Sequence, residues 1–516
     1  MTTPFSSFDD DDIPLPDPAR QPENPRVGAR TAISAAWVIG SRLMAKCIDL
    51  ALLVVLARLL TPADFGVVAI AMTLVQIVEA AFELPVIQVL VRMSEVDRRH
   101  YDTAFTMGLA RGLVLAVALG LMAIPFASFY GDQRIIPIIV ALSFAPASRG
   151  MLSPRMADYA RAIDFRRDVA IEVGGKLVAF AIATGVAFAT HSYWALVIGT
   201  VTTPFTMLVI SFVLAPYRPR LSLFDWRTFA DFLSWTTASQ IIVAFNWQFD
   251  RLLLGRFVNS TRLGLYSMAN DLSYLPEQSI IVPIKRPLLS AFAAIGNDRE
   301  RVAEVYLRTS ALLLAAGLPP IAGLSVLAEP AVRLALGAKW LPAVPILQWL
   351  AVTMIAPLFV SALGPLALAL GQTRILLRQS VVELVVRVPL MTAGVLVAGL
   401  WGAVAMRIVV GVIMAAVSFW FVNQIVRMPM RRQLAAAGLP LFAGLVLTLT
   451  LVALRPLLDG VTGLALAIGL GLTGLAGLAT YIATIFAVWR LTGRGLGIED
   501  RIVDYLKTLP VLRGKS

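Results

Sequence analysis

The chain has 516 residues, of which 58% are hydrophobic and only 15% are charged, against roughly 25% charged residues in soluble domains. Its mean hydropathy is +0.79. This composition excludes a soluble globular protein, and recurring runs of about twenty apolar residues indicate a polytopic membrane protein. The formal net charge of +12 does not require a nucleic-acid partner, because basic loops and contact with anionic membrane lipids account for it.

The N-terminal segment differs from the rest of the chain. Residues 1–29 are acidic and rich in proline, without an apolar stretch. This predicts a disordered tail and not a secretory signal peptide, which needs a basic start and an apolar core. Cys47 is the only cysteine, so no intramolecular disulfide can form.

Beyond the tail, hydropathy predicts an all-α protein with about fourteen transmembrane helices. The expected spans are residues 31–57, 64–91, 102–128, 134–151, 169–190, 193–214, 229–254, 263–284, 305–327, 342–370, 376–398, 401–425, 437–454 and 461–489. An even number places both termini on one side of the membrane. The loops on that side carry 20 basic residues and the opposite loops 7, so the positive-inside rule predicts cytoplasmic termini.

The sequence contains an internal repeat. Residues 56–71 read LARLLTPADFGVVAIA and residues 254–269 read LGRFVNSTRLGLYSMA. A constant offset of 198 positions aligns several matching residues, namely Arg58 with Arg256, Gly66 with Gly264, Glu79 with Glu277 and Pro85 with Pro283. Six spans separate the copies, so they share one orientation, as in transporters with parallel repeats.

The repeat predicts two six-helix lobes, at residues 30–215 and 216–426, followed by two extra helices within 436–490 and a cytoplasmic tail at 491–516. It continues further along the chain with small insertions. Glu172 and Lys176 match Glu383 and Arg387, and Trp194 matches Trp401.

The two repeated segments are expected to turn between the first two helices of their lobes, on the periplasmic side. Pro62 with Asp64, and Asn259 with Arg262, supply turn chemistry. The pseudo-two-fold axis predicts that the segments face each other across the outer mouth and separate when it opens.

Four stretches resemble hallmark segments of the oligosaccharide flippase family, the Wzx-type polysaccharide exporters of the multidrug/oligosaccharidyl-lipid/polysaccharide superfamily. They are LARLLTPADFGVVAIA, FDRLLLGRFVNSTRLGLYSMA, ALGAKWLPAVPILQWLA and YWALVIG, and the resemblance spans roughly residues 30–490. It implies flipping of an undecaprenyl-diphosphate-linked oligosaccharide across the bacterial inner membrane. It also implies a V-shaped pair of lobes around a hydrated cationic cavity, coupled to a H⁺ or Na⁺ gradient, and a glycan polymerase as a further partner.

Charged residues within the spans form the candidate site. An ionised group at mid-bilayer costs about 2.5–3.5 kcal/mol on insertion scales, so such residues normally face a water-filled path or a partner. Guanidinium and ammonium groups suit a diphosphate or an acidic sugar. The candidate substrate-binding residues are therefore Arg42, Lys46, Arg111, Arg149, Arg251 and Arg407.

Structural explanations compete with this interpretation. Arg149 could instead snorkel to the cytoplasmic interface, and Asp250 could form a structural ion pair beside Arg251 near the rim. The pairs Glu172–Lys176 and Glu383–Arg387 are spaced to neutralise each other along their helices.

Four acids are candidate ion-coupling residues: Asp49, Glu79, Asp250 and Glu277. Asp49 shares one helical face with Arg42 and Lys46. Glu79 and Glu277 lie deep in their spans, six residues before Pro85 and Pro283, where each helix can kink. The pair is interpreted as a protonatable hinge, with a purely structural role as the alternative.

The sequence favours a transporter over an enzyme and predicts no cofactor or metal. It has no GxxxxGK[ST] phosphate loop and no HExxH zinc motif, and His100 and His191 fall on opposite sides of the membrane. A lipid II or multidrug exporter of the same architecture is the nearer alternative. A membrane glycan polymerase or ligase is the alternative of a different class, and it would need more than the longest expected outer loop, LAEPAVRLALGAKWL.

Overall fold

The computed structural model describes residues 25–492 except 85, 94, 163, 165, 225, 228–233 and 297. This described part is helical and contains no β-strand, in agreement with the all-α prediction. Most of the two expected tails lies outside it. Helix α1 begins at Pro25, so helix already occupies the last five residues of the segment expected to be a tail.

The N-terminal half consists of α1 (Pro25–Leu59), α2 (Pro62–Ala81), α3 (Val86–Arg92), α4 (Arg98–Tyr130), α5 (Ile135–Leu142), α6 (Phe144–Gly150), α7 (Met156–Arg161), α8 (Arg166–Thr190) and α9 (Trp194–Leu214). Local chemistry sets the boundary between α1 and α2. The Thr61 backbone N–H donates to Asp64 Oδ2 at 2.9 Å, and the Thr61 hydroxyl accepts from the Asp64 N–H at 3.3 Å. This capping box starts α2 at Pro62.

The C-terminal half consists of α11 (Ser234–Phe257), α12 (Ser260–Pro276), the π-helix η1 (Glu277–Ile281), α13 (Val282–Ile295), α14 (Arg299–Val326), α15 (Ala328–Ala335), the 3₁₀ turn η2 (Ala338–Ala343), α16 (Val344–Thr353), α17 (Ile355–Phe359), α18 (Leu363–Ala369) and α19 (Thr373–Val426). The segment expected to be the longest outer loop is thus mostly the short helix α15 and the turn η2. Pro330 and Val332 of α15 are buried, so packing explains why this segment is ordered.

Helix α19 is a hairpin of two arms. The chain leaves helical geometry at Ala398 and Gly399, where Gly399 has φ 58°, a backbone angle that favours glycine. A Cβ atom on Gly402 would overlap the carbonyl oxygen of Gly394, so small residues let the arms pack closely. The arms correspond to the expected spans 376–398 and 401–425.

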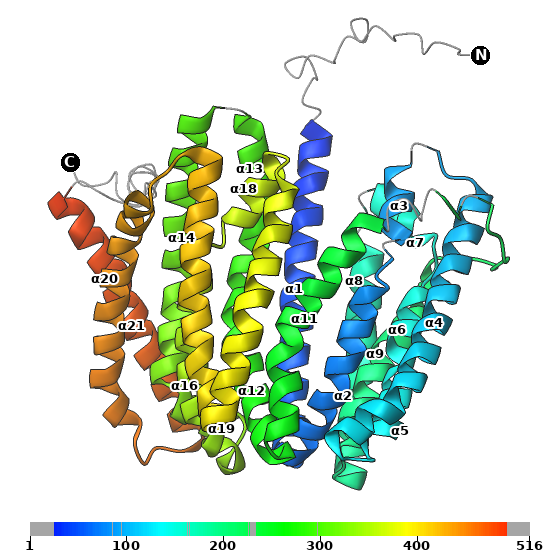
Figure 1. Cartoon of the computed structure of the whole chain (residues 1–516), viewed down its shortest axis with the longest axis horizontal. Helices are drawn as coiled ribbons and strands as arrows, with labels where there is room; N and C mark the ends of the chain where they lie inside the picture. Colours follow the sequence, from blue (N-terminus) through cyan, green and yellow to red (C-terminus); the bar gives the residue numbers. More distant parts are fainter. Residues whose placement is uncertain are drawn as a thin grey trace, which may run out of the picture.

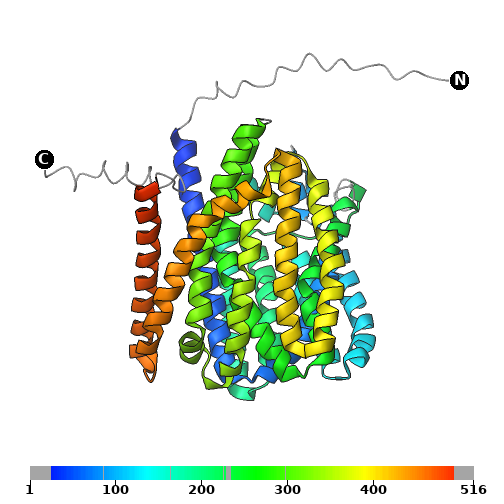
Figure 2. The ribbon, with the colours of Figure 1, turned by 60° about the vertical axis from the view of Figure 1, so that its left-hand side comes forward.

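The last helices, α20 (Met430–Leu454), the 3₁₀ turn η3 (Arg455–Leu458) and α21 (Gly463–Thr492), stand at one side of the bundle (Figure 2). Helix α20 packs against α14 and α21. Only 17% of the most apolar stretch of α21 is buried inside the protein, as expected for a helix at the edge of a membrane protein.

Nine helices in the described part of the chain are long and apolar enough to cross a membrane. They cover ten of the fourteen expected spans, because α19 alone covers two. Span 134–151 is formed by the shorter apolar helices α5 and α6. The count of fourteen and the division into repeat lobes stay predictions.

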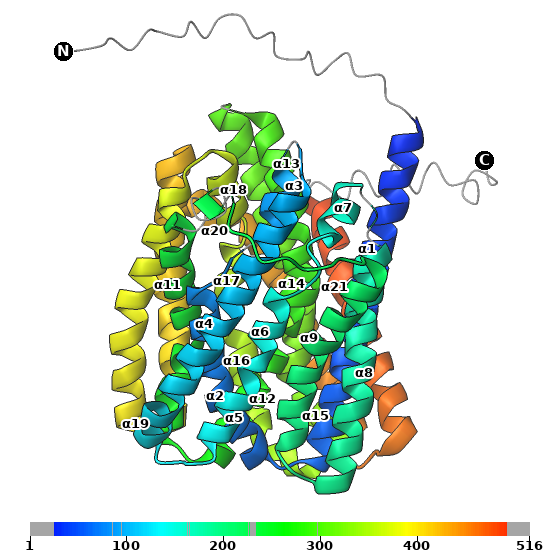
Figure 3. The ribbon, with the colours of Figure 1, turned by 90° about the vertical axis from the view of Figure 1, so that its right-hand side faces the viewer.

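The two ends of the bundle are distinct. Helix α1 begins and α21 ends at the same end, where α3, α7, α13 and α18 also lie (Figures 1 and 3). At the opposite end α1 finishes and α2 begins, and we call this the Gly66 end. The described helices therefore start and finish at the same end of the bundle, and the side on which the termini lie stays a prediction.

At the Gly66 end the two repeated segments touch. Helix α2 packs directly against α12, and a Cβ atom on Gly66 would overlap the Ser260 carbonyl oxygen, while one on Gly264 would overlap the Pro62 carbonyl oxygen. The two glycines thus bring the starts of α2 and α12 together across the two halves.

A reciprocal capping contact reinforces this end. The Arg58 guanidinium donates to the carbonyl oxygens of Leu334 and Ala335 at 2.5 and 2.9 Å. In return, Lys339 Nζ donates to the Arg58 carbonyl oxygen at 2.7 Å and the Trp340 indole N–H donates to that of Ala57 at 2.8 Å. The end of α1 and the α15–η2 segment thus satisfy each other's terminal carbonyls.

Candidate functional site

A buried carboxylate organises the C-terminal half. Asp250 on α11 is 3% exposed. Arg387 Nε and Nη2 donate to its two oxygens at 3.1 and 2.9 Å, and Arg407 Nη1 donates to Oδ2 at 3.2 Å. Arg387 precedes and Arg407 follows the turn at Gly399, so the kink of α19 directs both guanidinium groups to one carboxylate.

Helix α12 completes this network. Arg407 Nη1 also donates to the Tyr266 hydroxyl at 2.9 Å and to Asn270 Oδ1 at 2.7 Å, and Nη2 donates to the Tyr274 hydroxyl at 2.8 Å. These partners are four residues apart, hence on one helical face. The Tyr266 hydroxyl donates in turn to Asp250 Oδ2 at 3.1 Å. One guanidinium group therefore ties α19 to both α11 and α12.

The cluster is electrically balanced. Arg387 Nη1 donates to Glu383 Oε1 at 2.8 Å, which confirms the expected pairing along the helix. Two guanidinium groups thus face two carboxylates, Asp250 and Glu383. A buried ion cluster is tolerated when its charges are paired and hydrogen bonded in this way.

Asp250 does not pair with its neighbour Arg251, which was the structural alternative for these two residues. Arg251 forms an ion pair with Asp271, whereas Asp250 turns to the two arms of α19. Consecutive residues of a helix point about 100° apart, so the two side chains reach different surroundings. Asp250 also lies in the interior and not at the rim.

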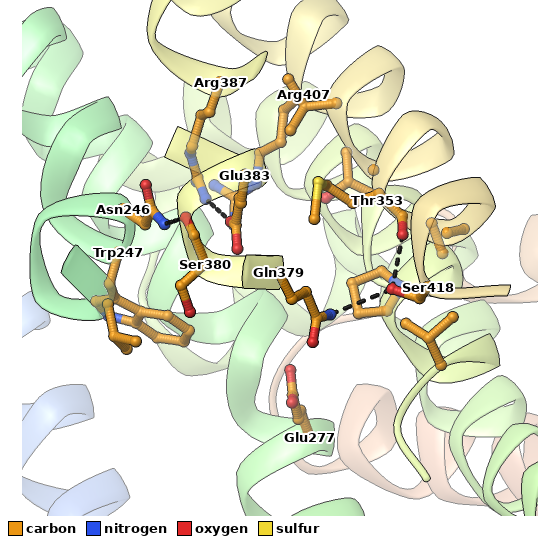
Figure 4. A pocket seen from close by; sticks show the side chains of 18 of the residues that line it. Asn246, Trp247, Glu277, Thr353, Gln379, Ser380, Glu383, Arg387, Arg407 and Ser418 are labelled. Carbon is orange, nitrogen blue, oxygen red and sulfur yellow. Dashed lines mark hydrogen bonds and ion pairs between the residues drawn. The ribbon is translucent and has the colours of Figure 1, made fainter. Parts of the chain in front are cut away.

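A cavity of about 250 Å³ lies beside this cluster. Its wall is formed by residues of α11, α12, η1, α16, α17 and both arms of α19. Figure 4 shows Trp247 on one side, Gln379 and Ser418 on the other, Glu277 at the bottom, and Glu383, Arg387 and Arg407 at the top. Two candidate residues, Arg407 and Glu277, therefore share one cavity.

A second cluster lies in the N-terminal half. Arg149 Nη1 forms an ion pair with Glu79 Oε1 at 2.6 Å, and Arg111 Nε donates to the Phe82 carbonyl oxygen. Both arginines line a cavity of about 180 Å³. Arg149 thus has a specific partner, and the structure brings it together with Arg111 and Glu79 as a second group of candidates.

Lys46 and Asp49, which share one face of α1, have different partners. Lys46 Nζ donates to Gln278 Oε1 on η1 at 2.9 Å, and Asp49 pairs with Lys176 Nζ on α8 at 2.6 Å. Lys176 lies 3.9 Å from Glu172, so the expected pair along α8 is present but longer. The side chain of Arg42 lies outside the described residues.

The predicted hinge around Glu277 coincides with a change of helix type. The π-helix Glu277–Ile281 separates α12 from α13, and π-helical turns occur frequently at functional sites. Glu277 Oε1 lies 3.3 Å from Lys285 Nζ. Pro283 follows in the first turn of α13, and its counterpart Pro85 lies outside the described residues.

Sequence reasoning missed several members of the network. It treated Arg387 only as the partner of Glu383, and it did not single out Tyr266, Asn270 or Tyr274. Their spacing of four residues on a span beside a candidate acid was the available signal. The partner helix could not be deduced, because the turn at Gly399 decides which arms meet.

Comparison with known proteins agrees with the sequence motifs. Residues 55–345 match the family model described as polysaccharide biosynthesis protein. The chain is 23% identical over 435 residues to the succinoglycan biosynthesis transport protein ExoT of Rhizobium meliloti (strain 1021), covering 82% of this chain and 87% of that protein. It is 23% identical over 425 residues to the lipopolysaccharide biosynthesis protein WzxC of Escherichia coli (strain K12), covering 81% and 86%.

Among solved structures, the fold is similar to that of the lipid II flippase MurJ in an inward closed conformation, with a TM-score of 0.67 and 14% identity. The match covers 90% of this chain and 100% of that one. At this identity the likeness concerns the fold alone. The family model and the transport-protein relatives confirm the resemblance seen in the sequence, and the chain belongs to the polysaccharide biosynthesis protein family, whose Wzx-type members are membrane transporters.

Proposed function

We propose that the protein flips undecaprenyl-diphosphate-linked oligosaccharide repeat units from the cytoplasmic to the periplasmic leaflet of the inner membrane, for surface polysaccharide synthesis. The carrying observation is the cluster in the N-terminal half. Arg111 and Arg149 line one cavity with Glu79 as the carboxylate paired there. Guanidinium groups bind phosphate oxygens with matched geometry, and two of them at one cavity suit a diphosphate.

Sidedness follows from the basic loops. The end at which α1 begins carries the loops with the larger number of arginines, so it is cytoplasmic under the positive-inside rule. The Gly66 end is then periplasmic. Contact between the two halves at that end supports an inward-facing arrangement, and alternating access would separate them there.

Coupling to a H⁺ or Na⁺ gradient is part of the proposal. Glu79 and Glu277 occupy matched positions and each has a basic partner, Arg149 and Lys285. Asp49 and Asp250 are the other candidate acids. Moving one charge across the membrane yields about 2.3 kcal/mol per 100 mV, which is enough to bias an equilibrium between two states. A glycan polymerase is the proposed downstream partner.

A lipid II or multidrug exporter remains the alternative within the superfamily, and a membrane polymerase or ligase the alternative of another class. Transport-protein relatives over more than four-fifths of the chain favour a glycan exporter that catalyses no covalent step.

The test uses the full chain in liposomes loaded with a fluorescent undecaprenyl-diphosphate-linked oligosaccharide, with a membrane-impermeant quencher added outside. We expect flipping to fall at least tenfold in the Arg111→Ala, Arg149→Ala double variant. Arg308→Ala is the matched control, because Arg308 forms an exposed ion pair with Glu304 and lines neither cavity. Flipping at the unaltered rate by the double variant, or no flipping by the unaltered protein, would overturn the proposal.

A further inference from the structure

The cavity of the C-terminal half has an aromatic wall. The rings of Trp247 and Tyr274 lie 4.3 Å apart between centroids, at 47° to each other, and both line the cavity. Trp247 remains 47% exposed, so its ring has a face that the protein does not cover. An aromatic face is electron-rich and attracts weakly positive C–H groups, such as those on one side of a pyranose ring.

Hydrogen-bonding groups stand across from this wall. Gln379 Nε2 donates to Ser418 Oγ at 3.2 Å, which leaves the Gln379 carbonyl oxygen for a ligand. Glu383 uses Oε1 to bind Arg387, which leaves Oε2. In Figure 4 both side chains extend into the space enclosed with Trp247 and Glu277. Acceptors placed opposite an aromatic ring suit a ligand with hydroxyl groups on its edge.

The charge of the cavity argues against an anion. Its two guanidinium groups already hold Asp250 and Glu383, and Glu277 is paired with Lys285. A diphosphate would have to displace these carboxylates, which would leave buried charges without partners. The cavity of the N-terminal half differs, because there the Arg111 guanidinium donates to the Phe82 carbonyl oxygen and not to a carboxylate.

We infer that the cavity beside Asp250 binds one neutral sugar ring, stacked on Trp247 and hydrogen bonded to Gln379 and Glu383. Its volume of about 250 Å³ falls below the roughly 300 Å³ at which pockets for drug-sized ligands begin, so it accommodates one ring of a glycan. The inference rests on the proposed function, since it takes the glycan as cargo. It divides recognition between the halves: diphosphate in the first, sugar in the second.

Free sugars test the inference without the lipid. The full chain in nanodiscs is titrated with methyl glucoside, methyl galactoside, methyl glucuronide and inorganic pyrophosphate, and saturation-transfer NMR reports contact with the sugar ring. We expect a neutral glycoside to bind, and its affinity to fall roughly tenfold in Trp247→Leu and in Gln379→Met, the loss expected for one stacking contact or hydrogen bond. Pyrophosphate binding should not change in either variant.

Trp420→Leu is the matched control, because Trp420 is 55% exposed on the second arm of α19 and does not line the cavity. Gln379→Met preserves side-chain length, and this variant tests the inference if Trp247→Leu fails to fold. Absence of glycoside binding, equal binding by folded Gln379→Met, or competition between pyrophosphate and glycoside would overturn the inference. Glycoside binding that depends on Trp247, without flipping in liposomes, would overturn the proposed function alone.

Discussion

Two charge clusters, one in each half of the chain, share one pattern of partners and lie in different surroundings. In the N-terminal half, Asp49 on α1 pairs with Lys176 on α8, which also faces Glu172. In the C-terminal half, Asp250 on α11 pairs with Arg387 on α19, which also binds Glu383. Each cluster thus joins the first long helix of its half to a helix that carries an acid four residues before its cation.

Burial separates the two. The side chain of Asp49 is 46% exposed and that of Asp250 only 4%. The buried copy has arginine in place of lysine and gains a second cation, Arg407. In the N-terminal half the position that corresponds to Arg407 is Thr200, by the offset of 207 that aligns Trp194 with Trp401. A fully buried acid needs more partners than a half-exposed one, and the cluster of the C-terminal half supplies them.

Removing the buried acid should have the largest effect. In Asp250→Asn, Arg387 and Arg407 lose their shared carboxylate inside the protein, and breaking a buried ion pair costs about 3–5 kcal/mol. We expect a large fall in the midpoint of thermal unfolding of the detergent-solubilised chain, or failure to accumulate in the membrane. Asp271→Asn, which removes an exposed acid from its pair with Arg251, is the control. An unchanged midpoint in Asp250→Asn would contradict the interpretation of the cluster.

Replacing Arg407 by threonine, the residue at the corresponding position of the N-terminal half, should have the next largest effect on stability. Arg407→Thr removes four hydrogen bonds, to Asp250, Tyr266, Asn270 and Tyr274, while Arg387 still neutralises Asp250. We expect a loss of roughly 3 kcal/mol, because several buried polar groups lose their partner. Thermal unfolding measures it, with Thr200→Val as the matched control in the other half. A loss as small as that of the control would show that Arg407 is dispensable.

A third prediction concerns a place where the halves should behave alike. In Gly264→Ala the new Cβ would meet the Pro62 carbonyl oxygen, and in Gly66→Ala that of Ser260. Each should cost about 2 kcal/mol by overpacking and weaken crosslinking between cysteines at positions 64 and 262 in a Cys47→Ala background. Gly120→Ala is the control, since a Cβ there meets nothing within 4 Å. Unequal effects of the two substitutions would show that the contact is not shared evenly.

The exposed acid should matter least for stability. In Asp49→Asn an ion pair with a half-exposed carboxylate is lost, and exposed pairs contribute about 0–1 kcal/mol. Thermal unfolding should change by no more than a few degrees, against the large effect of Asp250→Asn. A comparable loss in both would remove the distinction between the buried and the exposed cluster.

The sequence predicted most of the fold. Apolar run lengths located the helices, and the offset between Gly66 and Gly264 pointed to the contact of α2 with α12. The sequence also supplied four members of the C-terminal cavity, Glu277, Glu383, Arg387 and Arg407. Helix positions and repeated motifs can be predicted from the sequence because helix period and hydropathy are local properties.

The rest depended on contacts between distant segments. A pair of Asp250 with Arg251 was the structural alternative, since adjacency in sequence was the visible relation, but the two arginines that bind Asp250 lie more than 130 residues away. The α15–η2 segment was expected to be a loop, yet Trp340 is fully buried there and binds the end of α1. Neither relation leaves a periodic trace in the sequence.

The reciprocal capping contact at the Gly66 end has a consequence for hydration. Arg58, Lys339 and Trp340 all donate to carbonyl oxygens that have no partner within their own helix ends. If the halves part there, water must take up every one of these bonds. Opening would then take up water molecules and become linked to water activity. Excluded osmolytes would favour the joined state, and the Gly66 end would respond to osmotic stress as well as to cargo.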